Sequence, residues 1–193
     1  MSMRVMLVDP RPTRREVLGP TLAAEGFDIV ACVPPDDDLL NAVARHAPDV
    51  VLIDIDSPSR DTLENLRSVQ ARQPRPMVMF TQDDAGESIR QAIEAGVTAY
   101  IVDGLENRRV RPIVEAAMAR FTQYRALEQE LTETRNKLAE RKLIERAKGL
   151  IMQQQGVSEA EAYQAMRKLA MRRNKKLAEI ADSVIAASEL MQG

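Results

Sequence analysis

The first 120 residues alternate five short apolar runs with five stretches of helical periodicity. Each run ends at a polar residue or a proline, as buried strands do, whereas the intervening stretches repeat apolar residues every three or four positions. The expected strands are 5–8, 27–33, 50–53, 77–80 and 99–102, and the expected helices are 14–25, 37–46, 61–72, 86–95 and 107–121. Strands buried on both faces and joined by helices form parallel sheets, so the pattern predicts a doubly wound α/β domain with a five-stranded sheet.

Polar side chains follow most of these expected strands. In a doubly wound sheet the carboxyl ends of the strands line the functional crevice. Asp9, Asp54, Thr81 and Asp103 stand at such ends. We therefore expect these four residues to line the pocket of the domain.

A helical pattern then continues from residue 107 to about 155, with no proline after Pro112 and no glycine between Gly104 and Gly149. Eight positions follow three-then-four spacing, and five of them are apolar or aromatic, which predicts a weak coiled-coil seam. They are Ala117, Arg120, Tyr124, Leu127, Leu131, Thr134, Leu138 and Arg141. Two interpretations remain, a solvated linker helix and a dimerising helix. The second is favoured because an isolated helix with so much polar surface gains little stability alone.

Two further helices complete the chain. Gly156 is a helix breaker, and Ser158 with Glu161 has the spacing of a capping box. That helix is expected to run to about residue 172, with a break near Asn174 and a last helix over 175–191. The predicted domains are an α/β domain over 1–120, a coiled-coil linker helix over 121–137 and an all-α three-helix domain over 138–193. Gly149 inside a helix costs about 1 kcal/mol relative to alanine, so it serves close helix packing or the close approach of a ligand.

Charge is unevenly distributed along the chain. Residues 141–176 hold ten basic and three acidic residues, an excess of seven positive charges, although the whole chain carries −2. The remainder therefore carries −9. Such asymmetry predicts an anionic partner for the C-terminal domain. A phosphate backbone is the natural counterpart, because each neutralised phosphate releases counterions.

Residues 1–120 resemble the receiver domain of two-component response regulators. The resemblance rests on Leu7-Val-Asp9, Leu52-Ile-Asp54-Ile-Asp-Ser-Pro58, Thr81 and Ala95-Gly96 with Tyr100. It implies a phosphoacceptor at Asp54, Mg²⁺ at Asp9 and Asp54, and a switch pair of Thr81 and Tyr100 that could couple partner binding to the helix face they flank.

Two departures weigh against phosphorylation. Pro10 fills the second acidic position of the pocket, and Asp103 stands where the family has a lysine that holds the phosphoryl group. Asp54 is then either a phosphoacceptor with Mg²⁺ beside it or a remaining carboxylate in a pseudo-receiver that binds a partner protein. The second interpretation is favoured, and no cofactor is expected.

Residues 138–190 closely resemble the ANTAR domain, which is named after the AmiR and NasR transcription antitermination regulators. The motif is Ala147-Lys148-Gly149, Met152 and Gly156, followed by Glu161-Ala-Tyr163. Three receiver segments further resemble the NasT-type antiterminators of nitrate assimilation, namely Ser57-Pro-Ser-Arg-Asp61, Pro74-Arg-Pro76 with Met79-Phe-Thr81, and Met118-Ala-Arg-Phe121.

The resemblance implies binding to paired hairpins of a leader RNA, which would block a terminator and let transcription of nitrate or nitrite assimilation genes continue. It also implies a nitrate- or nitrite-sensing, NasS-like partner protein that sequesters the regulator, and a homodimer through the coiled coil. The expected RNA contacts are Lys142, Arg146, Lys148, Gly149, Arg167, Lys168, Arg172 and Arg173. Tyr163 could either stack on a base or pack in the three-helix core.

Other classes of protein fit less well. The alternative function is a DNA-binding response regulator activated by phosphorylation at Asp54, but the last helix is apolar and acidic after Lys176, which makes a poor recognition helix. A protein that only binds other proteins would show no salt-sensitive nucleic-acid binding. An enzyme is not expected, because no glycine-rich phosphate loop and no nucleophile–base pair occurs. One cysteine, no signal-peptide pattern and no long apolar run predict a cytoplasmic protein without a membrane segment.

Overall fold

The computed structural model describes residues 2–11, 13–102 and 107–192. The chain divides into two compact units, residues 1–125 and 126–193. Within the described ranges, no helix is long and apolar enough to cross a membrane.

The first unit contains the predicted five-stranded parallel sheet. Its strands are β1 (Met3–Val8), β2 (Phe27–Val33), β3 (Val50–Asp54), β4 (Met77–Thr81) and β5 (Ala99–Val102). They lie in the order β2-β1-β3-β4-β5, and all neighbouring pairs are parallel. This order places the carboxyl ends of β1 and β3 side by side. The α/β fold class is confirmed.

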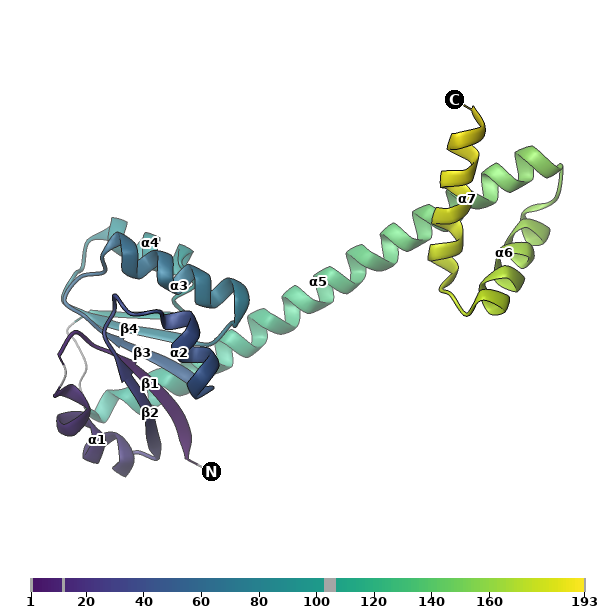
Figure 1. The fold of residues 1–193 in the computed structure, drawn as a ribbon. Coiled ribbons are helices and arrows are strands. Elements are labelled where there is room, and N and C mark those ends of the chain that lie inside the picture. The colour runs from purple at the N-terminus through teal and green to yellow at the C-terminus, as the bar shows by residue number, and fades with distance from the viewer. Residues whose placement is uncertain (1, 12, 103–106, 193) are drawn as a thin grey trace. The chain divides into compact units, whose positions relative to one another are not determined.

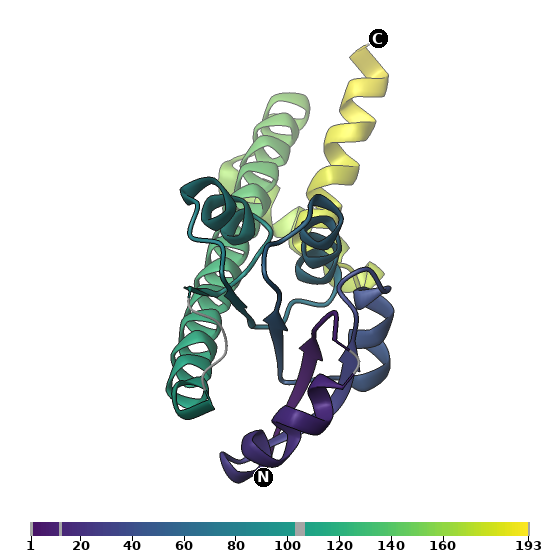
Figure 2. The same ribbon diagram turned by 90° about the vertical axis from the view of Figure 1, so that its left-hand side faces the viewer.

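Helices cover both faces of this sheet (Figures 1 and 2). They are α1 (Arg14–Ala24), α2 (Leu39–His46), α3 (Arg60–Arg72), α4 (Gly86–Glu94) and the first turns of α5 (Asn107–Gln155). Alternate strand residues face alternate layers: Met6 packs in the core under α2, α3 and α4, and Leu7 packs in the core under α1 and α5. The apolar runs are therefore continuous because both faces of each strand are buried.

A glycine sets the close approach of α3 to the turn before β5. Gly96 has a φ of +96°, and a Cβ added there would lie 2.6 Å from Cγ of Gln70. Only glycine tolerates both the left-handed backbone and this contact.

The second unit is a small all-helical domain. The C-terminal part of α5 packs with α6 (Glu159–Arg173) and α7 (Leu177–Gln192) around one core that includes Ala147, Met166 and Ile180. The predicted capping box is present, because Ser158 Oγ accepts from the backbone N–H of Glu161 and the Glu161 carboxylate accepts from the backbone N–H of Ser158. α6 ends at Arg173 and is capped by Asn174, whose φ of +50° is left-handed.

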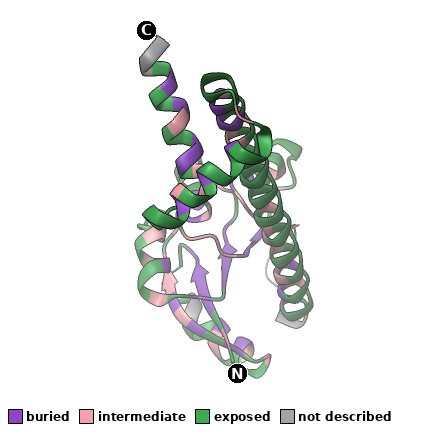
Figure 3. Ribbon diagram, turned by 90° about the vertical axis from the view of Figure 1, so that its right-hand side faces the viewer, coloured by how far each residue is buried: buried purple, intermediate pink, exposed green. Residues whose placement is uncertain are grey.

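Between the two cores, α5 buries almost nothing. Every residue from 129 to 142 is exposed, and Figure 3 shows this helix as exposed along most of its length. Apolar side chains occur on it nonetheless: Tyr124, Leu127, Leu131 and Leu138 are all at least half exposed. Ala117, the first position of the predicted seam, is buried in the core of the first unit, whereas these four apolar residues of the seam are not covered by the rest of the described chain.

Candidate functional site

Two aspartates and one arginine meet at the carboxyl edge of the sheet. Asp9 follows β1 and Asp54 ends β3, so parallel pairing of these strands brings the two buried carboxylates together. Arg11 bridges them. Its Nε donates to Oδ1 of Asp9 at 2.8 Å, and its Nη2 donates to Oδ2 of Asp9 at 2.9 Å and to Oδ2 of Asp54 at 2.9 Å.

The ion pairs are electrostatically strong because the two acids are buried. The hydrogen bond to Asp9 and the negative charges of Asp54, Asp9 and Asp56 raise the pKa of the Arg11 guanidinium further above its ordinary value, so the cation is permanent. The sequence prediction missed Arg11. The available signal was a basic residue two positions after the first acidic residue of the pocket.

The arrangement does not fit the Mg²⁺ ion implied by the receiver resemblance. Mg²⁺ needs carboxylate oxygens that are free to coordinate it. Three of the four oxygens of Asp9 and Asp54 accept hydrogen bonds from Arg11 instead. Within the described ranges no group of three or more His, Cys, Asp or Glu side chains could hold a metal ion. Asp103, the remaining predicted pocket residue, lies outside the described residues.

Thr81 is held by the loop that follows β3, and Tyr100 by the loop that follows β4. Thr81 Oγ1 donates to the carbonyl of Asp56 at 2.7 Å, and the Tyr100 hydroxyl donates to the carbonyl of Asp83 at 2.8 Å. Partial burial and the nearby charge of Asp83 raise the pKa of Tyr100. The Asp83 carboxylate accepts from the hydroxyl of Ser57 at 2.7 Å, which is the largest cause of its lowered pKa. Thr81 is thus bonded to the loop after β3 and Tyr100 to the loop after β4, and the Ser57–Asp83 hydrogen bond joins these two loops.

The basic residues of the C-terminal unit fall into two groups. Lys142 and four cations on α6 are exposed: Arg167, Lys168, Arg172 and Arg173. Arg146 forms an ion pair with Glu189 at 2.8 Å. Lys148 is buried and its ammonium contacts Glu145 at 2.8 Å and Glu159 at 2.5 Å. These contacts raise the pKa of Lys148, with Glu145 the larger cause, and they join α5 to the start of α6.

Comparison with known families agrees with both units. The sequence matches the response regulator receiver domain over residues 5–115 and the ANTAR domain over residues 132–185. The chain belongs to the response regulators that join a receiver domain to an ANTAR domain. It is 29% identical over 182 residues to the transcriptional regulatory protein PdtaR of Mycobacterium tuberculosis. The aligned region covers 94% of this chain and 89% of PdtaR.

Solved receiver domains share the fold of the first unit. A CheY-like receiver from Methanospirillum hungatei superposes with a TM-score of 0.55 at 18% identity, covering 64% of this chain and 99% of that one. The receiver domain of the response regulator NarL from Mycobacterium tuberculosis gives a TM-score of 0.53 at 20% identity, covering 61% and 97%. At these identities the similarity demonstrates the fold alone.

The sequence allowed a packing role for two residues of the ANTAR motif, Gly149 and Tyr163, and the structure supports it for neither. A Cβ added at Gly149 would meet nothing within 4 Å, so packing against the described residues does not require this glycine. Tyr163 is 38% exposed and is not part of the three-helix core. The interpretation of Tyr163 as a core residue was therefore wrong, since α6 buries Ala162 and Met166 instead.

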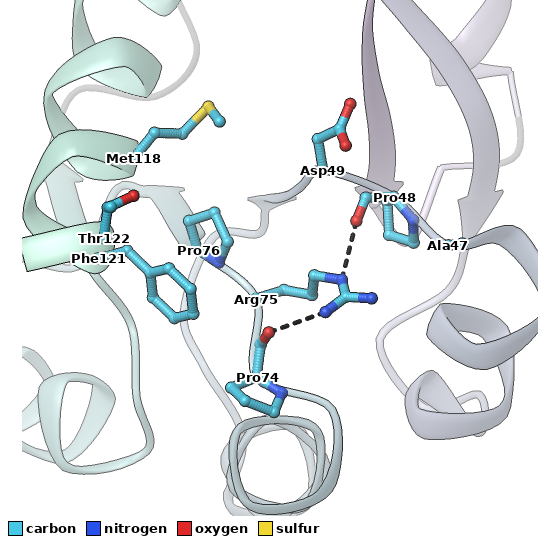
Figure 4. Close-up of a pocket in the computed structure, with 9 residues that line it drawn as sticks. All are labelled: Ala47, Pro48, Asp49, Pro74, Arg75, Pro76, Met118, Phe121 and Thr122. Atoms are coloured by element: carbon cyan, nitrogen blue, oxygen red, sulfur yellow. Dashed lines mark hydrogen bonds between the residues drawn. The ribbon is translucent and has the colours of Figure 1, made fainter. Parts of the chain in front are cut away.

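The receiver domain also contains a cavity of about 330 Å³, whose lining residues are drawn in Figure 4. It lies at the amino ends of β3 and β4, whereas Asp54 stands at the carboxyl end of β3. Pro48, Pro74, Met118 and Phe121 contribute to its walls. Arg75 is fixed in it by donating from Nε to the carbonyl of Pro48 and from Nη1 to that of Pro74, both at 3.0 Å. Sequence reasoning did not single out this cavity, because its walls come from segments far apart in the chain.

Proposed function

We propose that this response regulator is an RNA-binding transcription antiterminator that acts on paired hairpins of a leader RNA. The observation that carries the proposal is the set of four exposed cations on α6, none of which pairs with a carboxylate of the described residues. Arg146 and Lys148, in contrast, are already compensated within the domain. A group of unpaired cations on a small domain attracts a polyanion, because binding releases the counterions that surround its phosphates.

Gly149 supports the same interface. Its position on α5 is exposed, and the space above it is open. A helix backbone without a side chain lets a ligand approach closely, which explains why a residue unfavourable in helices is present there. We keep Lys142, Gly149, Arg167, Lys168, Arg172 and Arg173 as RNA contacts and assign Lys148 primarily to holding α6 against α5.

The contacts in the receiver crevice support control by a sensor partner rather than by phosphorylation. Arg11 engages both carboxylates that a phosphoryl-transfer site would need for its metal ion. We propose that the receiver domain is regulated by a nitrate- or nitrite-sensing, NasS-like protein and that the target genes are those of nitrate or nitrite assimilation. This rests on the NasT-like receiver segments.

A homodimer through α5 completes the proposal. Tyr124, Leu127 and Leu131 are 59%, 62% and 51% exposed, and Leu138 is 54% exposed. Their spacing places them on one stripe of the helix, as in the seam of a two-stranded coiled coil. A second copy of α5 would bury this stripe, and two ANTAR domains would match two hairpins.

The test is filter retention of a two-hairpin leader RNA by the purified chain over a range of salt concentrations, with a promoter duplex in parallel. Wild type should bind the RNA, and affinity should fall with salt. Arg172→Ala/Arg173→Ala should weaken binding and lower the salt slope by about 1.5 to 2, because two phosphate contacts are lost. Arg67→Ala/Arg72→Ala on α3, both exposed, changes the net charge equally and should bind as wild type. Preference for the duplex would favour the DNA-binding alternative.

A further inference from the structure

An exposed stripe on α6 combines an aromatic ring, a guanidinium and a thioether. Tyr163, Arg167 and Met171 follow one another at four-residue spacing, so each lies one turn above the last with a drift of about 40°. All three are exposed, and Met171, at 74%, is the most exposed of the large apolar residues that the structure describes. The stripe lies beside the buried face of α6, where Ala162, Met166 and Ala170 enter the core.

Nothing in the ANTAR domain explains the position of this tyrosine. The ring is outside the core, and its hydroxyl has no hydrogen-bond partner among the described residues. The backbone beneath it is nevertheless rigid. Ser158 and Glu161 form the capping box of α6, and Glu159, one turn before Tyr163, is held to α5 by Lys148. A flat ring on a fixed helix, with a cation one turn away, is therefore presented to solvent.

We propose that Tyr163, with Arg167 beside it, is the platform on which an unpaired base of the RNA hairpin stacks. This deepens the proposed function and rests on it. Paired bases are enclosed in the A-form helix, whereas loop bases can be splayed out onto aromatic rings and guanidinium planes. The four exposed cations of α6 favour a nucleic acid over an apolar protein segment, because a nucleic acid offers a base to the tyrosine ring and phosphates to the cations.

The probe is the same two-hairpin RNA with 2-aminopurine placed at each unpaired loop position in turn. Stacking on a tyrosine ring quenches 2-aminopurine fluorescence. Wild type should quench at least one position on binding, and Tyr163→Phe should quench the same position with unchanged affinity, since the ring is kept. Tyr163→Leu should abolish that quenching and weaken binding by roughly 5- to 150-fold, the loss of one base stack. Its salt slope should match wild type, because no phosphate contact is removed.

Comparing wild type with Tyr163→Leu separates the proposal of RNA binding from the proposal of a stacking platform at Tyr163. If wild type retains no RNA on the filter, the proposed function fails, and this inference fails with it. If wild type binds RNA but Tyr163→Leu binds equally well, or no loop position is quenched, the platform alone is overturned. Thermal unfolding of each variant checks the fold, and an exposed side chain should leave the midpoint unchanged.

Discussion

Replacement of Arg11 by alanine is the most informative perturbation of the receiver domain. Asp9 and Asp54 are 3% and 6% exposed, and Arg11 donates three side-chain hydrogen bonds to them. Without the guanidinium, both carboxylates stay buried beside each other. We expect Arg11→Ala to destabilise the domain and to create a response to Mg²⁺ that the natural chain lacks.

The magnitude follows from the burial of the partners. Removing one member of a fully buried ion pair costs about 3 to 5 kcal/mol. The Arg11 side chain is itself 49% exposed, so solvent screens part of the interaction. The discounted cost is about 2 kcal/mol. At about 4 °C per kcal/mol for a domain of this size, the melting midpoint should fall by about 8 °C.

Differential scanning calorimetry of the full chain measures this shift. Arg11→Lys should lose less stability, because it keeps the charge but not the forked geometry. Arg90→Ala is the matched control, since the Arg90–Glu87 pair is short, at 2.6 Å, but both side chains are exposed. That change should shift the midpoint by less than about 2 °C. For a Kd of about 1 mM, about 10 mM Mg²⁺ should restore roughly 1.4 kcal/mol to Arg11→Ala.

Two results would refute this reasoning about Arg11. One is a melting midpoint of Arg11→Ala within the range of the Arg90→Ala control, which would mean that the guanidinium does not neutralise the crevice. The other is an equal stabilisation of wild type and Arg11→Ala by Mg²⁺, which would mean that Arg11 does not compete with the metal ion.

Three further predictions concern stability. Met166→Ala removes a side chain that is 1% exposed in the ANTAR core and should cost about 3 kcal/mol, seen as a lower calorimetric midpoint for that domain alone. Gly96→Ala adds a Cβ 2.6 Å from Gln70 at a φ of +96° and should lower the free energy of unfolding of the receiver domain by about 2 kcal/mol in urea denaturation, whereas an unchanged urea midpoint would contradict the contact. The hydrogen bonds with Ser158 lower the pKa of Glu161 below its ordinary 4.5. Its stabilising contribution is therefore present above about pH 4.5 and lost as the pH falls through the folded-state pKa, and Glu161→Gln should show less of this acid sensitivity in helical circular dichroism.

Much of the fold could be predicted because its signals are local. Apolar runs ending in polar residues define β1, β3 and β4, and the Ser158–Glu161 spacing defines the start of α6 within one turn. The meeting of Asp9 with Asp54 was also predictable, since carboxyl ends of parallel strands share one edge of the sheet. Ala147 and Met166 stand on the apolar stripes of their helices in the sequence, and both lie in one core in the structure.

The sequence by itself determined the order of elements, the two domains and the location of the charge excess, because each depends on composition or on residues within a few positions of one another. The tertiary structure alone decided which charges are compensated. Arg11 reaches Asp54, 43 residues away, only because β1 lies beside β3, and Lys148 reaches Glu159 only because α6 folds back against α5. The tertiary structure also decided that Tyr163 faces solvent. Helical periodicity allowed the ring on either side of α6, and packing placed Ala162 and Met166 in the core instead.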